Sequence, residues 1–232
     1  MEESKYKFSI QTSNNGILNA NLEEGNALFV LGANGVGKSS LMFSLFEQNI
    51  EHSKRVLAHR QTWFTDNVMN LTASQKKNAD NSIKNSDKYI DSRWKNIYAA
   101  NRSSLSIFNL INSENVRSRK ITKAVDQDNI DKAKKLSNIQ APIQAINELF
   151  TLSNIPIKIV LGKDEQLFAS KNGSDLYSVA ELSDGERNAL LISSDVLTTA
   201  PNQMIILDEP ERHLHRSIIS PLLTSLFNKR KD

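Results

Sequence analysis

The chain contains no cysteine among its 232 residues, and aromatic residues make up only 6% of it. Without thiols it can form no disulfide, no thiolate metal site and no cysteine nucleophile. No apolar run approaches the ~20 residues that cross a bilayer. The start Met-Glu-Glu-Ser also lacks the basic and apolar regions of a signal peptide. We therefore expect a cytoplasmic protein with no membrane partner.

Glycine and proline are missing from the middle of the chain, because neither occurs between Gly37 and Pro142. These residues most often end regular structure, so the stretch should be largely helical. Residues 66–150 contain fourteen Lys and Arg against nine Asp and Glu, an excess of +5. We predict a helical, basic insertion and favour self-assembly over nucleic-acid contact, because the excess is modest for its length. For the same reason we interpret Trp94 as a core or interface anchor rather than a base-stacking residue.

Three of the eight glycines form a phosphate-loop pattern. Residues 32–39 are Gly-Ala-Asn-Gly-Val-Gly-Lys-Ser, after an apolar run at 28–31 and before a helix-forming run at 40–47. We expect a strand, an anion-binding loop and a helix whose N-terminus points at the phosphates. Lys38 should reach the β- and γ-phosphates of ATP, and Ser39 should ligate Mg²⁺. The alternative is a glycine-rich turn without a ligand. The predicted nucleotide-binding residues are Asn34, Gly35, Val36, Gly37, Lys38, Ser39 and Ser40.

An acidic motif follows a second apolar run. Residues 204–207 are Met-Ile-Ile-Leu, typical of a buried parallel strand, and Asp208-Glu209-Pro210 come next. Asp208 is predicted to hold the magnesium, and Glu209 to orient the attacking water as a general base. The alternative is that both carboxylates only cap the loop that Pro210 begins.

A capping box precedes the acidic motif. Ser183 is followed three residues later by Glu186 and then by apolar residues at helical spacing, which predicts a helix that ends before Pro201. A purely structural cap is the alternative to a functional role.

In this order the motifs resemble those of ABC-type ATPases. The resemblance lies in Gly-x-Asn-Gly-x-Gly-Lys-Ser at 32–39, Leu-Ser-x-Gly-Glu at 182–186 and Ile-Ile-Leu-Asp-Glu-Pro at 205–210. It implies an α/β phosphate-loop fold with an antiparallel β sub-sheet. Strand-like alternation near the N-terminus and at 155–161 agrees with such a sub-sheet. We predict ATPase lobes at 1–65 and 151–232 around the helical insertion at 66–150.

The resemblance also implies a head-to-tail dimer. The signature segment of one subunit would face the γ-phosphate that Lys38 holds in the other. Asp184 departs from the family, which more often has glycine there, and a carboxylate beside a triphosphate needs a cation such as Arg187. The signature residues assigned to the nucleotide are Ser183, Gly185 and Glu186.

Two further features of the superfamily concern Gln61 and the C-terminus. A predicted strand at 54–60 precedes Gln61, and the resemblance assigns this glutamine to Mg²⁺ and the attacking water; a solvated loop glutamine is the alternative. The superfamily places a switch histidine on a later strand, but only twenty-three residues follow Glu209. We expect an incomplete C-terminus rather than an ATPase lacking that group. His213 and His215 are interpreted as interface residues, because no further ligand completes a metal site.

Residues 58–64, 181–187 and 208–215 are also similar to the AriA-like ATPases of the PARIS anti-phage systems. That resemblance implies a homo-oligomeric ATPase that senses a phage-derived trigger and controls a Toprim-type effector nuclease. The ATPases of retron and Septu systems are close competitors. A DNA-repair ATPase of the RecF or SMC-like type is the main alternative, with DNA as partner. A transporter subunit fits less well, because the helical insertion does not suit docking on membrane helices.

Overall fold

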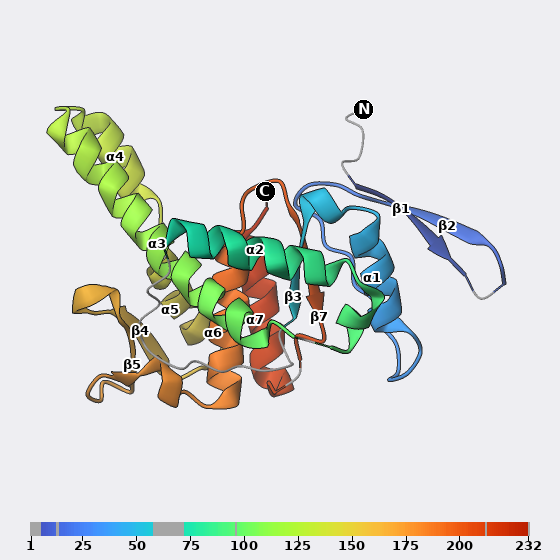
Figure 1. The fold of residues 1–232 in the computed structure, drawn as a ribbon. Helices are drawn as coiled ribbons and strands as arrows, with labels where there is room; N and C mark the ends of the chain where they lie inside the picture. The colour runs from blue at the N-terminus through green and yellow to red at the C-terminus, as the bar shows by residue number, and fades with distance from the viewer. Residues whose placement is uncertain (1–5, 13, 58–71, 96, 212, 232) are drawn as a thin grey trace.

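The computed structural model describes residues 6–12, 14–57, 72–95, 97–211 and 213–231. It has a mixed α/β fold, as expected, in which the helices α2 to α5 follow one another in the middle of the chain and strands lie before and after them (Figure 1). The strands are β1 (Tyr6–Gln11), β2 (Ile17–Leu22), β3 (Ser53–Leu57), β4 (Ile157–Leu161), β5 (Leu167–Lys171), β6 (Tyr177–Ser178) and β7 (Met204–Asp208). The helices are α1 (Lys38–Glu47), α2 (Ala73–Asp87), α3 (Ala99–Asp126), α4 (Ile130–Asn138), α5 (Pro142–Leu152), α6 (Asp184–Thr198) and α7 (Arg216–Lys229). Short 3-10 turns are η1 (Ile50–His52), η2 (Ile90–Arg93), η3 (Lys163–Glu165) and η4 (Val179–Glu181).

Two strands, β3 and β7, pair in parallel. Leu57 is in register with Asp208, so both strands end at the same edge. The prediction that 204–207 form a buried parallel strand is confirmed, since Met204 and Ile206 are only 8% and 5% exposed. The carboxyl end of β7 therefore places Asp208 at that edge.

Antiparallel pairs form the remaining sheets, which confirms the predicted sub-sheets. β1 and β2 make one hairpin, and β4, β5 and β6 make a three-stranded sheet. The turn between β5 and β6 is closed by the Ser174 N–H, which donates to the Lys171 carbonyl at 2.9 Å. Asn172 and Gly173 have positive φ in this turn, which suits asparagine and glycine.

The predicted strand at residues 28–31 is wrong. No strand is assigned there, and within the described residues β7 pairs with β3 alone. Phe29 instead packs edge-on against Phe227 of α7, with ring centroids 5.6 Å apart. Leu28, Phe29 and Leu31 are 45%, 62% and 87% exposed, so the apolar composition of this run is accompanied neither by burial nor by backbone pairing with β7.

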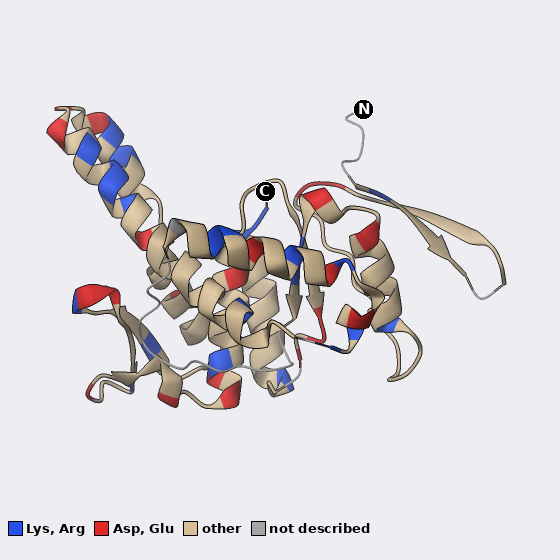
Figure 2. Ribbon diagram, viewed as in Figure 1, with Lys and Arg blue, Asp and Glu red and all other residues tan. Residues whose placement is uncertain are grey.

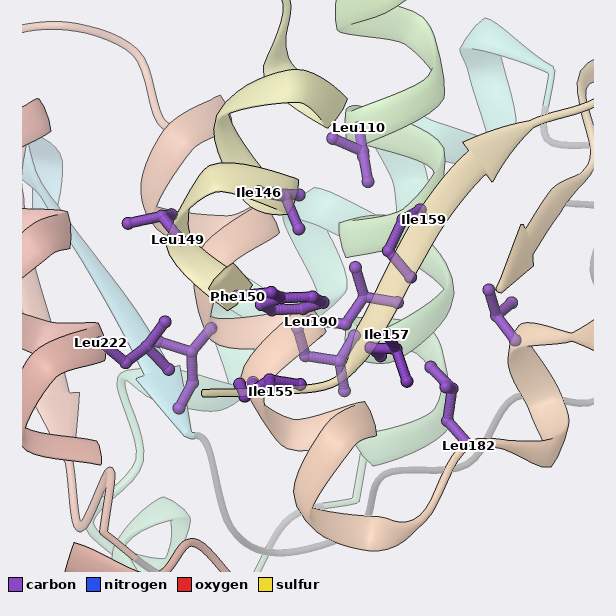
Figure 3. Close-up of a cluster of buried hydrophobic side chains, with 14 of the residues drawn as sticks. Leu110, Ile146, Leu149, Phe150, Ile155, Ile157, Ile159, Leu182, Leu190 and Leu222 are labelled. Atoms are coloured by element: carbon purple, nitrogen blue, oxygen red, sulfur yellow. The ribbon is translucent and has the colours of Figure 1, made fainter. Parts of the chain in front are cut away.

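The main core surrounds α6. Its apolar residues recur at helical spacing, and Leu190 and Ile192 are fully buried against α3, α5, β4 and α7 (Figure 3). Phe150 of α5 lies in the middle of this cluster (Figure 3). Each buried side chain of this size contributes about 1.5–3 kcal/mol relative to an exposed one. This packing holds the N-terminus of α6 in place.

The middle of the chain is helical, as its lack of glycine and proline predicts. The first half of α3 is buried in the core, whereas its second half pairs with α4 in a hairpin that projects from the body (Figure 1). We call residues 116–139 the arm. The predicted boundary after residue 150 falls within α5, and the division into lobes stays a prediction. None of the helices in the described residues is long and apolar enough to cross a membrane.

Trp94 is not a core anchor. Trp94 directly follows the tight turn η2 and is 55% exposed, so the core alternative is wrong and the interface alternative stays a prediction. The guanidinium of Arg93 lies over the Trp94 ring, 5.0 Å from its centroid. This contact covers one face of the indole at the surface.

Candidate nucleotide-binding site

The phosphate loop has the backbone that its glycines predict. Gly35 and Gly37 have φ of 83° and 95°, a region that residues with a Cβ rarely adopt. Gly37 is the N-cap of α1, and its carbonyl accepts the Leu41 N–H at 3.0 Å. The N–H groups of the first turn, at Lys38, Ser39 and Ser40, have no partner within the helix. They form the positive end of the helix, where an anion binds favourably.

Lys38 folds back over this loop. Its ammonium donates to the carbonyls of Gly32 and Ala33 at 2.8 and 3.0 Å. Both acceptors are neutral, and a charged phosphate oxygen is a stronger partner for the same ammonium. The lysine is therefore positioned to exchange these carbonyls for a phosphate.

Ser39 and Asp208 meet although 169 residues separate them. The Ser39 hydroxyl donates to Asp208 Oδ1 at 3.4 Å, and Asp208 is only 3% exposed. A hydroxyl and a carboxylate are the hard oxygen ligands that Mg²⁺ takes together with substrate phosphates. Within the described part of the chain, no group of three His, Asp or Glu side chains could hold a metal ion.

Glu209 follows directly and has a left-handed backbone, with φ of 49°. This conformation is uncommon for a residue with a side chain and concentrates at functional turns. The strand β7 ends at Asp208, directly before this residue. A cavity of about 480 Å³ runs from the loop, at Asn34 and Lys38, along the edge of β7 that lies away from β3.

The signature segment forms the predicted capping box. Glu186 N–H donates to the Ser183 hydroxyl at 3.3 Å, and the hydroxyl and N–H of Ser183 donate to the Glu186 carboxylate at 2.7 and 3.0 Å. Asp184 is exposed and pairs with Arg187 at 3.7 Å, the cation that the sequence suggested. The carboxylate that departs from the family pattern is thus compensated within its own helix turn.

Gly185 has a role that the capping box did not reveal. A Cβ built on it would lie 3.0 Å from the His213 carbonyl and 3.6 Å from Leu214 Cδ2. The first turn of α6 therefore lies directly against the segment that follows the acidic motif. This packing joins the signature to the loop after Glu209, and only glycine permits so close an approach without a shift.

The two halves of the predicted site lie apart in one chain. The N-termini of α1 and α6 are at the same lower edge of the molecule in Figure 1 but on opposite sides, with α7 and β7 between them. Ser39 of the loop meets Asp208 of the acidic motif, whereas Gly185 of the signature packs against His213 and Leu214. Gln61 lies outside the described residues.

Arg93 is a neighbour of the site that sequence reasoning missed. Its Nη1 donates to the Ser40 hydroxyl at 2.6 Å, across 53 residues of sequence. No local motif surrounds Arg93, so only the folded chain reveals the contact.

Comparison with known proteins gives one match. A family model described as "AAA domain, putative AbiEii toxin, Type IV TA system" matches residues 43–231, most of the chain. Neither the curated proteins nor the solved structures gave a match. The matched range includes the signature segment and the acidic motif, and it begins just after the phosphate loop. The chain therefore belongs to this AAA domain family, a family of phosphate-loop ATPases related to the ABC and SMC-like ATPases.

Proposed function

We propose that the protein is an ABC-type ATP hydrolase that works as a head-to-tail dimer. The contact between Ser39 and the buried Asp208 is the observation that carries this proposal. It joins the first turn of a helix with three unpaired N–H groups to a carboxylate at the end of a strand. This arrangement suits a nucleotide triphosphate with its magnesium.

Each residue then has a chemical task. Lys38 and the first turn of α1 hold the phosphates, and Ser39 and Asp208 hold the magnesium, which neutralises charge that develops on the phosphates. Glu209 accepts a proton from the attacking water. We assign Gln61 to the magnesium and the same water. Asn34, Gly35, Val36, Gly37 and Ser40 complete the nucleotide contacts.

A second subunit supplies the lid. The N-terminus of α6 is a second helix end that suits an anion, and in Figure 1 α7 and β7 lie between it and the N-terminus of α1. In a head-to-tail pair, Ser183, Gly185 and Glu186 of each subunit would face the γ-phosphate of the other. Hydrolysis removes that phosphate and weakens the dimer.

The biological role that we propose is control of a toxic partner. The description of the matched family names a toxin and a type IV toxin–antitoxin system. The sequence motifs also resemble those of the AriA-like ATPases of PARIS defence. On this proposal homo-oligomers of the ATPase hold a Toprim-type nuclease and release it in response to a phage-derived trigger.

Replacement of the base tests the enzymatic proposal. Glu209→Gln should keep ATP binding, reduce turnover at least ~100-fold as expected for loss of a general base, and accumulate dimers in ATP and Mg²⁺. Glu211→Gln is the matched control, because it removes an exposed carboxylate two residues away. ATP hydrolysis and the mass in solution are measured for both. Full turnover in Glu209→Gln would refute the assignment of the base.

A DNA-metabolism ATPase of the RecF or SMC-like type is the second candidate. It is favoured by the Lys and Arg residues spread along the projecting arm (Figure 2). This candidate predicts hydrolysis stimulated by DNA and binding that weakens steeply with salt. The same purified protein, assayed with and without duplex DNA at several salt concentrations, separates the two.

A further inference from the structure

The turn η2, between α2 and α3, reaches the first turn of α1. Arg93, its last residue, donates from Nη1 to the Ser40 hydroxyl at 2.6 Å. Ser40 also carries one of the N–H groups that α1 leaves unpaired toward an anion. The Ser40 side chain therefore lies between the Arg93 guanidinium and the position where the N-terminus of α1 would hold a phosphate.

Arg93 is held in a defined orientation. Its Nε donates to the Ile90 carbonyl at 3.2 Å, and its guanidinium lies over the Trp94 ring, 5.0 Å from the centroid. A planar guanidinium offers several donors in a fixed arrangement and suits phosphate oxygens better than a lysine ammonium. A preoriented cation also loses less side-chain entropy when it binds.

The same turn is anchored to three other elements. Ser92 is buried, accepts a hydrogen bond from Arg55 Nη1 of β3 at 2.7 Å and donates to the Asp87 carbonyl at the end of α2 at 3.2 Å. The Asp87 carboxylate pairs with Arg102 of α3 at 2.6 Å. A displacement of η2 would thus reach β3, α2 and α3 through polar contacts that are largely buried.

We propose that Arg93 is a nucleotide-binding residue, which exchanges the Ser40 hydroxyl for a phosphate oxygen of bound ATP and so couples nucleotide occupancy to α2 and α3. The proposal rests on the proposed ATP-binding function and adds to it a cation from the helical insertion. A phosphate oxygen is charged and therefore a stronger acceptor than a hydroxyl, which favours the exchange. Because α3 continues into the arm, occupancy would be communicated to the part of the molecule that projects farthest from the body.

Affinity measurements test the contact. Arg93→Ala should weaken ATP binding roughly 10- to 100-fold, the usual range for a lost charge-assisted hydrogen bond, and Arg93→Lys should restore part of it. The control is Lys95→Ala, which removes an exposed lysine of the same segment whose partner is Asp91 at 2.8 Å. Isothermal titration calorimetry gives the affinities, and thermal melting checks that each variant is folded.

Trp94 supplies a second, independent signal. The chain has two tryptophans, so Trp63→Phe leaves Trp94 as the single indole. Loss or rotation of the guanidinium over its ring should change its emission on ATP binding, with the concentration dependence seen by calorimetry. In the Arg93→Ala version of this protein, ATP should leave the emission unchanged.

The outcomes separate the inference from the function on which it rests. Wild-type affinity in Arg93→Ala, or Trp94 emission that ignores bound ATP, would overturn the role of Arg93 and leave the ATPase proposal intact. Failure of the wild-type protein to bind ATP would overturn both. Weakened binding in Arg93→Ala with partial rescue by lysine and an ATP-dependent Trp94 signal would support the inference.

Discussion

Glu186 shows how a single residue of the signature makes stability depend on pH. Burial alone would raise its pKa, but the hydrogen bonds from Ser183 and the nearby Lys171 ammonium hold the pKa below its ordinary value of 4.5. A lowered pKa means that the ionised carboxylate stabilises the fold above about pH 4.5. That contribution is lost as the pH falls through the pKa of the folded state.

Glu186→Gln should therefore lower the free energy of unfolding by about 0.3–1 kcal/mol at neutral pH, the usual effect of a charge at a helix N-terminus. The difference from the wild type should shrink as the pH falls below 4.5. Urea denaturation at several pH values measures it. Asp175→Asn is the control, because it removes an exposed carboxylate from a loop. If the difference in unfolding free energy between Glu186→Gln and the wild type did not depend on pH, the charge of the Glu186 carboxylate would not be what stabilises the fold.

The residues that the sequence predicted best are those whose partners are near in the chain. The Ser183–Glu186 box and the glycine conformations of the phosphate loop are local, so spacing alone indicates them. The close approach of Gly185 to His213 and the bond between Arg93 and Ser40 join residues far apart in sequence. No local pattern carries them, and the sequence did not predict either one.

At the scale of elements, four segments of the chain meet at one buried charge. Asp87 ends α2, is 4% exposed, and pairs with Arg102 of α3 at 2.6 Å and with Arg55 of β3 at 3.6 Å. Ser92 of η2 bonds Arg55 as well. Removing one member of such a group leaves buried cations without their carboxylate, which costs more than the group itself contributes.

Asp87→Asn should lower the free energy of unfolding by about 3–5 kcal/mol, because Arg55 and Arg102 remain in place. Asp91→Asn is the matched control: Asp91 pairs with Lys95 at the surface, and its loss should cost less than about 1 kcal/mol. Urea denaturation of both variants gives the comparison. Equal losses would mean that the buried group does not join these elements as described.

Helices and strands were predicted correctly where one local property of the sequence determines them. They were missed where packing against distant segments determines the structure. The helix α6 follows from its capping box and apolar spacing, α1 from the helix-forming run after the phosphate loop, and the parallel strand β7 from its apolar run. The run at 28–31 is as apolar as residues 204–207 of β7, but Phe29 packs on α7 and no strand is assigned there. The burial of Arg55 was not predicted either. Its partners Asp87 and Ser92 come from α2 and η2, which are distant from β3 in the sequence.

At the scale of the whole molecule, the arm projects from the body (Figure 1). α4 packs mainly against α3, and Arg117 ties its end by donating to the carbonyls of Ser137 and Ile139 at 2.8 and 3.0 Å. The backbone at 118 and 137 therefore lies close enough for a short glycine linker. Replacing residues 119–136 removes the buried Ala124 and Ala133 together, and both lie outside the main core cluster, so the free energy of unfolding should change by no more than about 1 kcal/mol.

The arm-less protein should still bind ATP and form the closed dimer, because its phosphate loop, acidic motif and signature are all retained. What it should lose is assembly beyond the dimer, if the arm serves self-association as its modest charge suggests. Analytical ultracentrifugation of Glu209→Gln protein with ATP and Mg²⁺, with and without the arm, measures this directly. Higher assemblies that persist without the arm would contradict its role in assembly. Loss of DNA-stimulated hydrolysis, with assembly unchanged, would instead assign the basic residues to nucleic acid, because salt-dependent phosphate contacts would then be their function.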